Sequence, residues 1–113
     1  MIVRVWTAQT TAGQLPAYLA HLRDRVLPEI KALEGYRGVR VLDRPLTEGI
    51  EVVVMTYWES MDAVRRFAGA DVERAVVAKE AVAMLTKFDE RVRHYVVALS
   101  DEVKPTTANS DLG

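Results

Sequence analysis

The stretch Ile50-Glu51-Val52-Val53-Val54-Met55-Thr56-Tyr57-Trp58 has the strongest strand-forming composition in the chain. β-Branched and aromatic residues dominate it, as is typical of strands. Alternation places Val53, Met55 and Tyr57 on one face, and Val52, Val54 and Trp58 on the other. Because both faces are apolar, the stretch predicts a central strand that is covered on both sides.

The segments before this strand predict a strand, a long helix and a second strand. Residues 2–7 alternate as a strand, and residues 39–44 form a shorter one that a turn connects to Ile50. Between them, apolar residues recur every three or four positions, as in a helix with one apolar face: Leu15, Leu19, Leu22, Val26, Ile30 and Leu33. Pro28 should interrupt this helix near Val26, and Gly35 should end it.

The segments after the central strand predict helices and one last strand. Ser60 is a typical helix cap, and Gly69 a typical end, for a helix with apolar residues at 61, 64, 67 and 68. Asp71 should cap a further short helix, and residues 79–88 are helical in composition. Residues 92–99 form the final predicted strand, and the polar residues 100–113 are expected to be a largely disordered tail.

This order of elements predicts an α+β, ferredoxin-like domain over residues 1–99. Its four-stranded antiparallel sheet carries the helices on one face. The other face would then be apolar and uncovered, and we expect Trp6, Val53, Met55 and Tyr57 to lie on it. A second copy of the same sheet is the simplest partner for such a face, so the sequence predicts a homodimer.

Composition excludes several classes of function. The 15 Lys and Arg nearly balance the 16 Asp and Glu, which argues against nucleic acid or an anionic membrane as partner. There are no cysteines, and the two histidines are far apart, so no metal-ligand spacing is present. No long apolar run or signal peptide is visible, and a cytoplasmic location is expected. The glycines form no phosphate-binding loop, so any oxygen chemistry should need no cofactor.

Several spaced motifs resemble the antibiotic biosynthesis monooxygenase-type domain. The motifs are Trp58-Glu59-Ser60, Ala63-Val64, Phe67-Ala68-Gly69, Asp71, Glu73, Ala75-Val76-Val77 and Val92-x-His94-Tyr95-x-Val97. The resemblance covers residues 1–99 and implies a dimeric α/β barrel. It also implies candidate functions that range from cofactor-free oxygenase to haem degradation.

The sequence departs from the catalytic sets of both characterised branches. Aligned on Trp58, the Asn, Trp and axial His of the haem-degrading branch fall on Thr7, Phe67 and Val77. Valine cannot ligate iron, so haem degradation is not expected. The Asn, Trp and Tyr of the anthrone-oxidising branch fall on Val54, Trp58 and Val64, of which only the tryptophan matches.

We therefore considered a small set of candidate site residues. His94 shares an apolar face with Val92 and Val96, and imidazole titrates near neutral pH, which suits a general base. The resemblance places Trp58, Val54 and Phe67 at substrate-binding positions. His21 falls on the polar side of the first helix and was expected to be exposed.

The sequence-based hypothesis is a cofactor-independent monooxygenase acting on a small aromatic or quinol-like substrate. Two alternatives stay open. One is a non-catalytic dimeric ligand-binding or stress-response protein. The other is a different small enzyme on the same scaffold, such as an isomerase, decarboxylase or cyclase. An enzyme should have a cavity between helices and sheet that a titratable group reaches.

Overall fold

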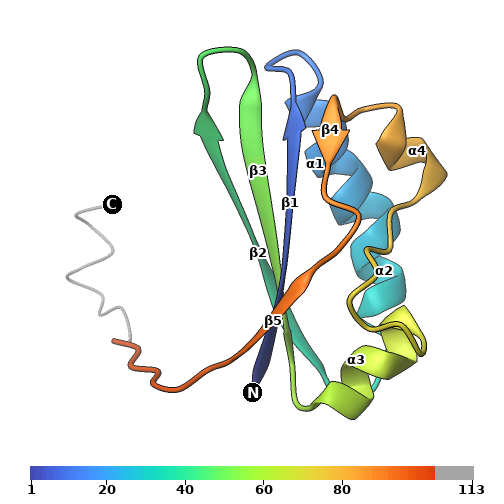
Figure 1. The fold of residues 1–113 in the computed structure, drawn as a ribbon, viewed down its shortest axis with the longest axis vertical. Helices are drawn as coiled ribbons and strands as arrows, with labels where there is room; N and C mark the ends of the chain where they lie inside the picture. Colours follow the sequence, from blue (N-terminus) through green and yellow to red (C-terminus); the bar gives the residue numbers. More distant parts are fainter. Residues whose placement is uncertain (104–113) are drawn as a thin grey trace.

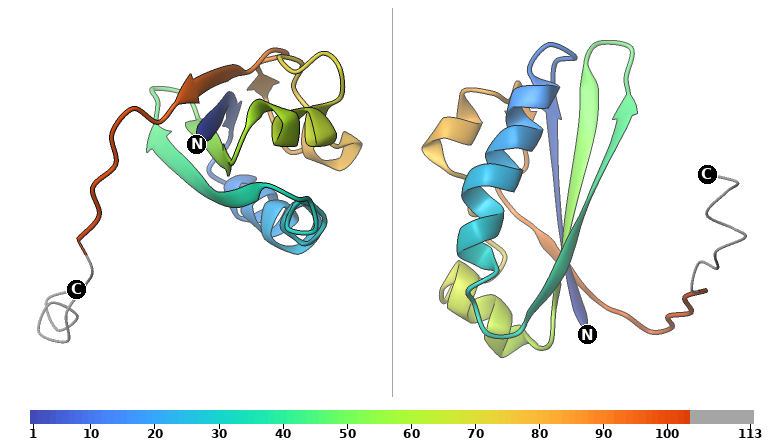
Figure 2. Two further views of the ribbon diagram at one scale, coloured as in Figure 1. Left: turned by 90° about the horizontal axis from the view of Figure 1, so that it is seen from below. Right: turned by 180° about the vertical axis from the view of Figure 1, so that it is seen from behind.

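One antiparallel sheet with helices on one face makes up the computed structural model, which describes residues 1–103 (Figures 1 and 2). The strands are β1 (Ile2–Thr10), β2 (Tyr36–Pro45), β3 (Ile50–Trp58), β4 (Lys87–Phe88) and β5 (Arg93–Val96). The helices are α1 (Leu15–His21), a π-helical turn (Leu22–Val26), α2 (Leu27–Ile30), α3 (Met61–Ala68) and α4 (Lys79–Val82). No helix among the described residues is long and apolar enough to cross a bilayer.

The strand order confirms the predicted ferredoxin-like sheet. β3 lies between β1 and β2, and the far edge of β1 pairs with both β4 and β5. The chain leaves the sheet between Phe88 and Arg93, so two short strands, β4 and β5, share the fourth strand position. The predicted tail falls on exposed residues 100–103 and on residues 104–113, which lie outside the described part.

β3 has the bounds that its composition predicts, and it is central. Its residues Val52, Thr56 and Trp58 are buried beneath the helices. β1 continues to Thr10, three residues beyond the predicted end, because it pairs with β3 along its whole length. This pairing sets which side chains of the two strands share a face.

The expectation that Trp6 lies on the uncovered sheet face is wrong. In the antiparallel register Trp6 is directly opposite Val54, and Arg4 is opposite Thr56. Directly opposed residues project to the same face, so Trp6 and Arg4 lie under the helices. Val53, Met55 and Tyr57 do lie on the uncovered face, where they are opposite Thr7, Val5 and Val3 of β1, respectively.

Pro28 interrupts the first helix as expected, and the interruption takes the form of a π-helical turn. The Leu27 N–H donates to the Leu22 carbonyl, five residues earlier. Pro28 has no N–H, so it cannot make the usual helical hydrogen bond, and the wider turn accommodates this. The π turn also brings residues five apart, such as His21 and Val26, onto one face.

The segment between α3 and β5 is less helical than predicted. Residues 71–76 form a turn and an isolated bridge between Arg74 and Arg91, in place of the expected helix at Asp71. Of residues 79–88, only Lys79–Val82 are helical. The predicted cap of α3 is confirmed, because the Ser60 hydroxyl accepts a hydrogen bond from the Ala63 N–H at 3.2 Å.

Gly35 permits the close approach of the α2–β2 loop to α3. Its φ is +89°, and a Cβ added there would lie 2.5 Å from the Ala63 Cβ. Gly69 has a similar φ of +85° but open space around it.

We expect Gly69→Ala to cost about 1–2 kcal/mol of unfolding free energy for its backbone conformation alone. Gly35→Ala should cost about 1–3 kcal/mol more than Gly69→Ala, because the added Cβ would also overlap Ala63. Urea denaturation of both variants measures this difference, and equal losses would contradict the packing argument.

Candidate functional site

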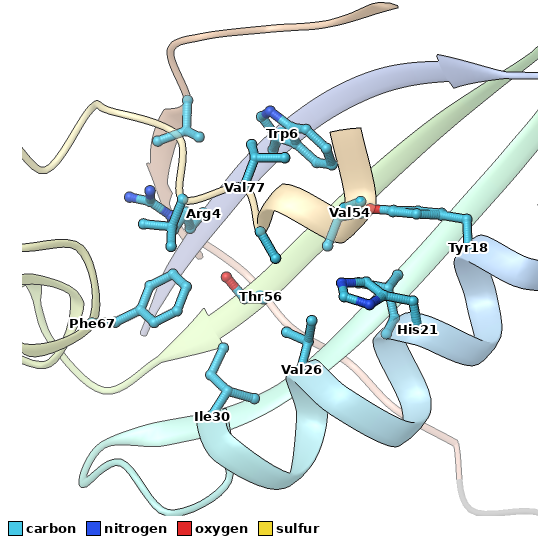
Figure 3. Close-up of a pocket in the computed structure, with 15 residues that line it drawn as sticks. Arg4, Trp6, Tyr18, His21, Val26, Ile30, Val54, Thr56, Phe67 and Val77 are labelled. Atoms are coloured by element: carbon cyan, nitrogen blue, oxygen red, sulfur yellow. The ribbon is translucent and has the colours of Figure 1, made fainter. Parts of the chain in front are cut away.

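A small cavity lies between the sheet and the helices (Figure 3). Its volume is about 90 Å³. Its lining is mainly apolar and comes from β1, β3, the helical residues 15–30, α3, α4 and the segments before α4 and β5. The lining residues are Arg4, Trp6, Tyr18, His21, Leu22, Val26, Ile30, Val54, Thr56, Phe67, Val76, Val77, Ala78, Ala81 and Val92. Any chemistry in the cavity therefore depends on a few polar side chains.

Two aromatic side chains form walls of the cavity. Trp6 is held by a hydrogen bond from its Nε1 to the Asp89 carbonyl at 2.6 Å and by a tilted contact with Phe88. Phe67, from α3, stacks on Trp58 with ring centroids 5.4 Å apart. Flat, fixed aromatic walls of this kind suit a flat ligand, because ring–ring contacts add to simple burial.

His21 is a cavity-lining polar residue whose hydrogen bonding is incomplete. The residue is 9% exposed and lines the cavity from the end of α1. Its Nε2 is buried and has no hydrogen-bond partner. Buried polar atoms are nearly always paired, so an unpaired imidazole nitrogen suggests that a ligand or water completes it. The expectation that His21 is exposed is wrong, because the helix places Tyr18 and His21, three residues apart, toward the sheet.

Two hydroxyl groups also line the cavity. Burial raises the pKa of the Tyr18 phenol, so this group stays protonated at neutral pH and can donate a hydrogen bond. The Thr56 hydroxyl accepts a hydrogen bond from the Trp58 Nε1 at 2.9 Å. Its own proton remains available, because a hydroxyl is both donor and acceptor.

Arg4 brings a buried positive charge to the other end of the cavity. The residue is 4% exposed, and Figure 3 shows Arg4 and Phe67 at one end, with Tyr18 and His21 at the other. Its guanidinium donates to the carbonyls of Val72 and Arg74. Burial lowers the pKa of Arg4 to about 10, so the group remains charged at neutral pH.

His94 contacts Arg4 and does not line the cavity. Its Nε2 lies 3.0 Å from the Arg4 Nη1. A guanidinium can only donate, so His94 Nε2 accepts, and the imidazole is neutral with its proton on Nδ1. Burial, together with the Arg4 charge, lowers the pKa of His94.

This arrangement predicts a pH dependence of stability. Because the pKa of His94 is lower in the folded chain, the unfolded chain binds more protons as the pH falls below the ordinary histidine value. The free energy of unfolding should therefore decrease between pH 7.5 and 5.5. His94→Gln keeps an acceptor for Arg4 but does not titrate, so its melting temperature should fall less over this range. Parallel slopes for the two proteins would contradict the contact.

The substrate-binding candidates divide into two layers. Val54 and Phe67 line the cavity directly. Trp58 is fully buried behind it, where its ring supports Phe67 and its Nε1 reaches Thr56. Sequence reasoning did not single out Arg4, and it placed His21 and Trp6 on the wrong side of their elements. The Tyr18-x-x-His21 spacing was the available signal for an inward-facing histidine.

The antiparallel sheet with helices on one face defines a ferredoxin-like domain, and comparison with known proteins shows the family to which this chain belongs. The chain matches the antibiotic biosynthesis monooxygenase family over residues 1–79. It therefore belongs to that family. Two curated relatives, uncharacterized proteins of Mycobacterium tuberculosis, are 29% identical over 89 residues, which is 78% of this chain. The chain spans 35% of the length of these relatives.

Three solved structures share the fold at low sequence identity. A Bacillus cereus structure of the antibiotic biosynthesis monooxygenase type has a TM-score of 0.65 and 23% identity, covering 93% of this chain and 98% of its own. The M. tuberculosis haem degrader MhuD, with two haems bound, has a TM-score of 0.62 and 21% identity, with 90% and 100% coverage. The Streptomyces coelicolor monooxygenase ActVA-Orf6, in complex with nanaomycin D, has a TM-score of 0.55 and 20% identity, with 93% and 92% coverage.

Proposed function

We propose that this protein is a cofactor-independent monooxygenase that oxidises a small aromatic or quinol-like substrate in the cavity. The observation that carries the proposal is the unpaired, buried Nε2 of His21 inside a mainly apolar, aromatic-walled space. Family membership and the monooxygenase among the structural neighbours support the reaction class.

The cavity volume limits the substrate to a single ring at most. At about 90 Å³ it is smaller than the roughly 150 Å³ of an engineered cavity that binds benzene. Val76 and Ala78, which line it from the loop before α4, are exposed. A ring of quinol size therefore requires this loop to shift, and a porphyrin would need far more space.

In this proposal His21 accepts a proton from the substrate hydroxyl. The resulting anion is electron-rich enough to pass an electron to dioxygen. The substrate, and not a group of the protein, is therefore the electron donor. For a hydroquinone, the substrate and O₂ together give a hydroxyquinone and water, so no other reductant is needed. The protein supplies the proton acceptor, a dry space and donors to the anion, here the hydroxyl groups of Tyr18 and Thr56.

The proposal is tested by oxygen uptake with no metal or flavin added. The panel comprises hydroquinones, catechols, dihydroxynaphthalenes and anthrones, and mass spectrometry with ¹⁸O₂ follows oxygen into the product. Single-ring quinols should be consumed fastest, with one labelled atom incorporated. Binding of these compounds without oxygen uptake would instead favour the non-catalytic ligand-binding protein.

We further propose that the protein is a homodimer formed through the uncovered sheet face. Val53, Met55 and Tyr57 on this face are only half-buried in the single chain. Covering several large apolar side chains stabilises by about 1.5–3 kcal/mol each at full burial. Light scattering at micromolar concentration should give twice 12.7 kDa. A mass of one chain would contradict this prediction while leaving the cavity argument intact.

A further inference from the structure

We propose that the substrate carries a carboxylate and that Arg4 binds it, so that the cavity selects hydroxylated aromatic acids. The inference rests on the proposed function and names the substrate class. It follows from the charge balance of the cavity, the unused donors of Arg4 and the arrangement of its two polar ends.

The charge balance of the cavity is incomplete. Arg4 is the one lining residue with a permanent charge, and no Asp or Glu is among the lining residues. No ion pair among residues 1–103 involves Arg4. A buried charge is costly unless an opposite charge or several hydrogen bonds compensate it. The carbonyls of Val72 and Arg74 and the Nε2 of His94 accept hydrogen bonds from Arg4, but none of the three is charged, and an anionic ligand would supply the missing negative charge.

Arg4 also retains donors of the right geometry. A guanidinium has five N–H groups, and the contacts with Val72, His94 and Arg74 use two on Nη1 and one on Nη2. The remaining two are the Nε N–H and one Nη2 N–H, on two neighbouring nitrogens of the planar group. A carboxylate accepts two parallel hydrogen bonds from such a pair, and this favours it over a singly coordinated anion.

The position of the charge explains how a substrate would be oriented. The Arg4 guanidinium carbon lies 5.6 Å from the centroid of Phe67, which forms the cavity wall at that end. His21 lies at the opposite end (Figure 3). A ring that lies along Phe67 with its carboxylate on Arg4 therefore directs a hydroxyl toward His21. Binding at one end would then orient the group that is deprotonated at the other.

Matched ligands test this without relying on any variant. Calorimetry on the wild-type protein, under anaerobic conditions, compares 2,5-dihydroxybenzoate with its methyl ester and with hydroquinone. The acid should bind at least tenfold more tightly than the ester, which retains the ring and both hydroxyls but has no charge. Equal affinity, or tighter binding of the ester, would overturn the inference.

Variants then assign the preference to Arg4. Arg4→Lys keeps the charge but not the paired donors, so the acid-to-ester ratio should fall to about threefold or less; circular dichroism confirms that the variant is folded. His94→Ala removes a neutral acceptor from Arg4 and leaves its charge, so the acid-to-ester ratio should stay at tenfold or more. A ratio that Arg4→Lys leaves unchanged would place the anion elsewhere.

The outcomes separate this inference from the proposed function. Preference for the acid without oxygen uptake would uphold the anion site and contradict the monooxygenase. Equal oxidation of the acid and the ester would uphold the monooxygenase and contradict the role of Arg4.

Discussion

Replacement of His21 by glutamine is expected to lower kcat for quinol oxidation by about 10²–10⁴-fold, the usual contribution of a general base. Glutamine keeps a similar size and a hydrogen-bonding group, but it cannot accept a proton near neutral pH. Because His21 Nε2 has no partner in the fold, the substitution breaks no hydrogen bond of that atom. Oxygen uptake at saturating substrate measures the loss, and the thermal melting curve should be little changed.

His94→Gln is the matched control for this experiment. The two histidines differ in that one lines the cavity and the other contacts Arg4. We expect His94→Gln to lower kcat by less than about tenfold, since it removes no group from the cavity. A large loss in His94→Gln with normal activity in His21→Gln would assign the base to His94, the residue that the sequence alone favoured.

Replacement of Trp58 by alanine is expected to cost about 3–5 kcal/mol of unfolding free energy. Trp58 is fully buried and packs with Ile30, Ala63 and Val64. Its removal would leave a large void and would also withdraw the ring on which Phe67 stacks. Urea denaturation gives the loss directly, and a change below about 1 kcal/mol would show that Trp58 does not anchor this core.

Trp58→Phe separates the two roles of the side chain. Phenylalanine keeps an aromatic surface for Phe67 but loses the hydrogen bond to Thr56. We expect a loss of about 1–2 kcal/mol, for the smaller ring and the missing donor. A loss as large as that of the alanine variant would mean that the hydrogen bond, and not packing, dominates.

Local sequence signals predicted most of the architecture. The composition of β3 gave both its bounds and its central place, because few stretches of nine residues are apolar on both faces. Ser60 and Gly69 predicted the start and the end of α3, since each has a specific role at a helix terminus. Pro28 predicted the interruption that became the π turn.

The residues that line the cavity could not be predicted in the same way. Alternation along β1 divides its side chains into two sets, but only the register with β3 decides which set lies under the helices. Trp6 was therefore assigned to the wrong face. His21 was misplaced for a related reason, because apolar periodicity defines the centre of a helix face only approximately, and an amphipathic histidine can lie within it.

The segment that closes the cavity shows a third limit. Asp71 predicted a short helix, but residues 71–78 form a turn, a bridge and an extended loop. Their backbone is held by long-range partners, which include Arg4 at Val72 and Arg74. Tertiary hydrogen bonds of this kind override local propensity, and no pattern within the segment signals them.

The central claim is that the cavity is the active site and that His21 faces the reacting group. A crystal structure of the complex with the best-oxidised quinol, prepared without oxygen, tests it most directly. The account predicts a ring between Phe67 and the helices, with a hydroxyl oxygen about 2.6–3.2 Å from His21 Nε2. A ligand bound outside this cavity, or one inside it with His21 Nε2 still unpaired, would contradict the account.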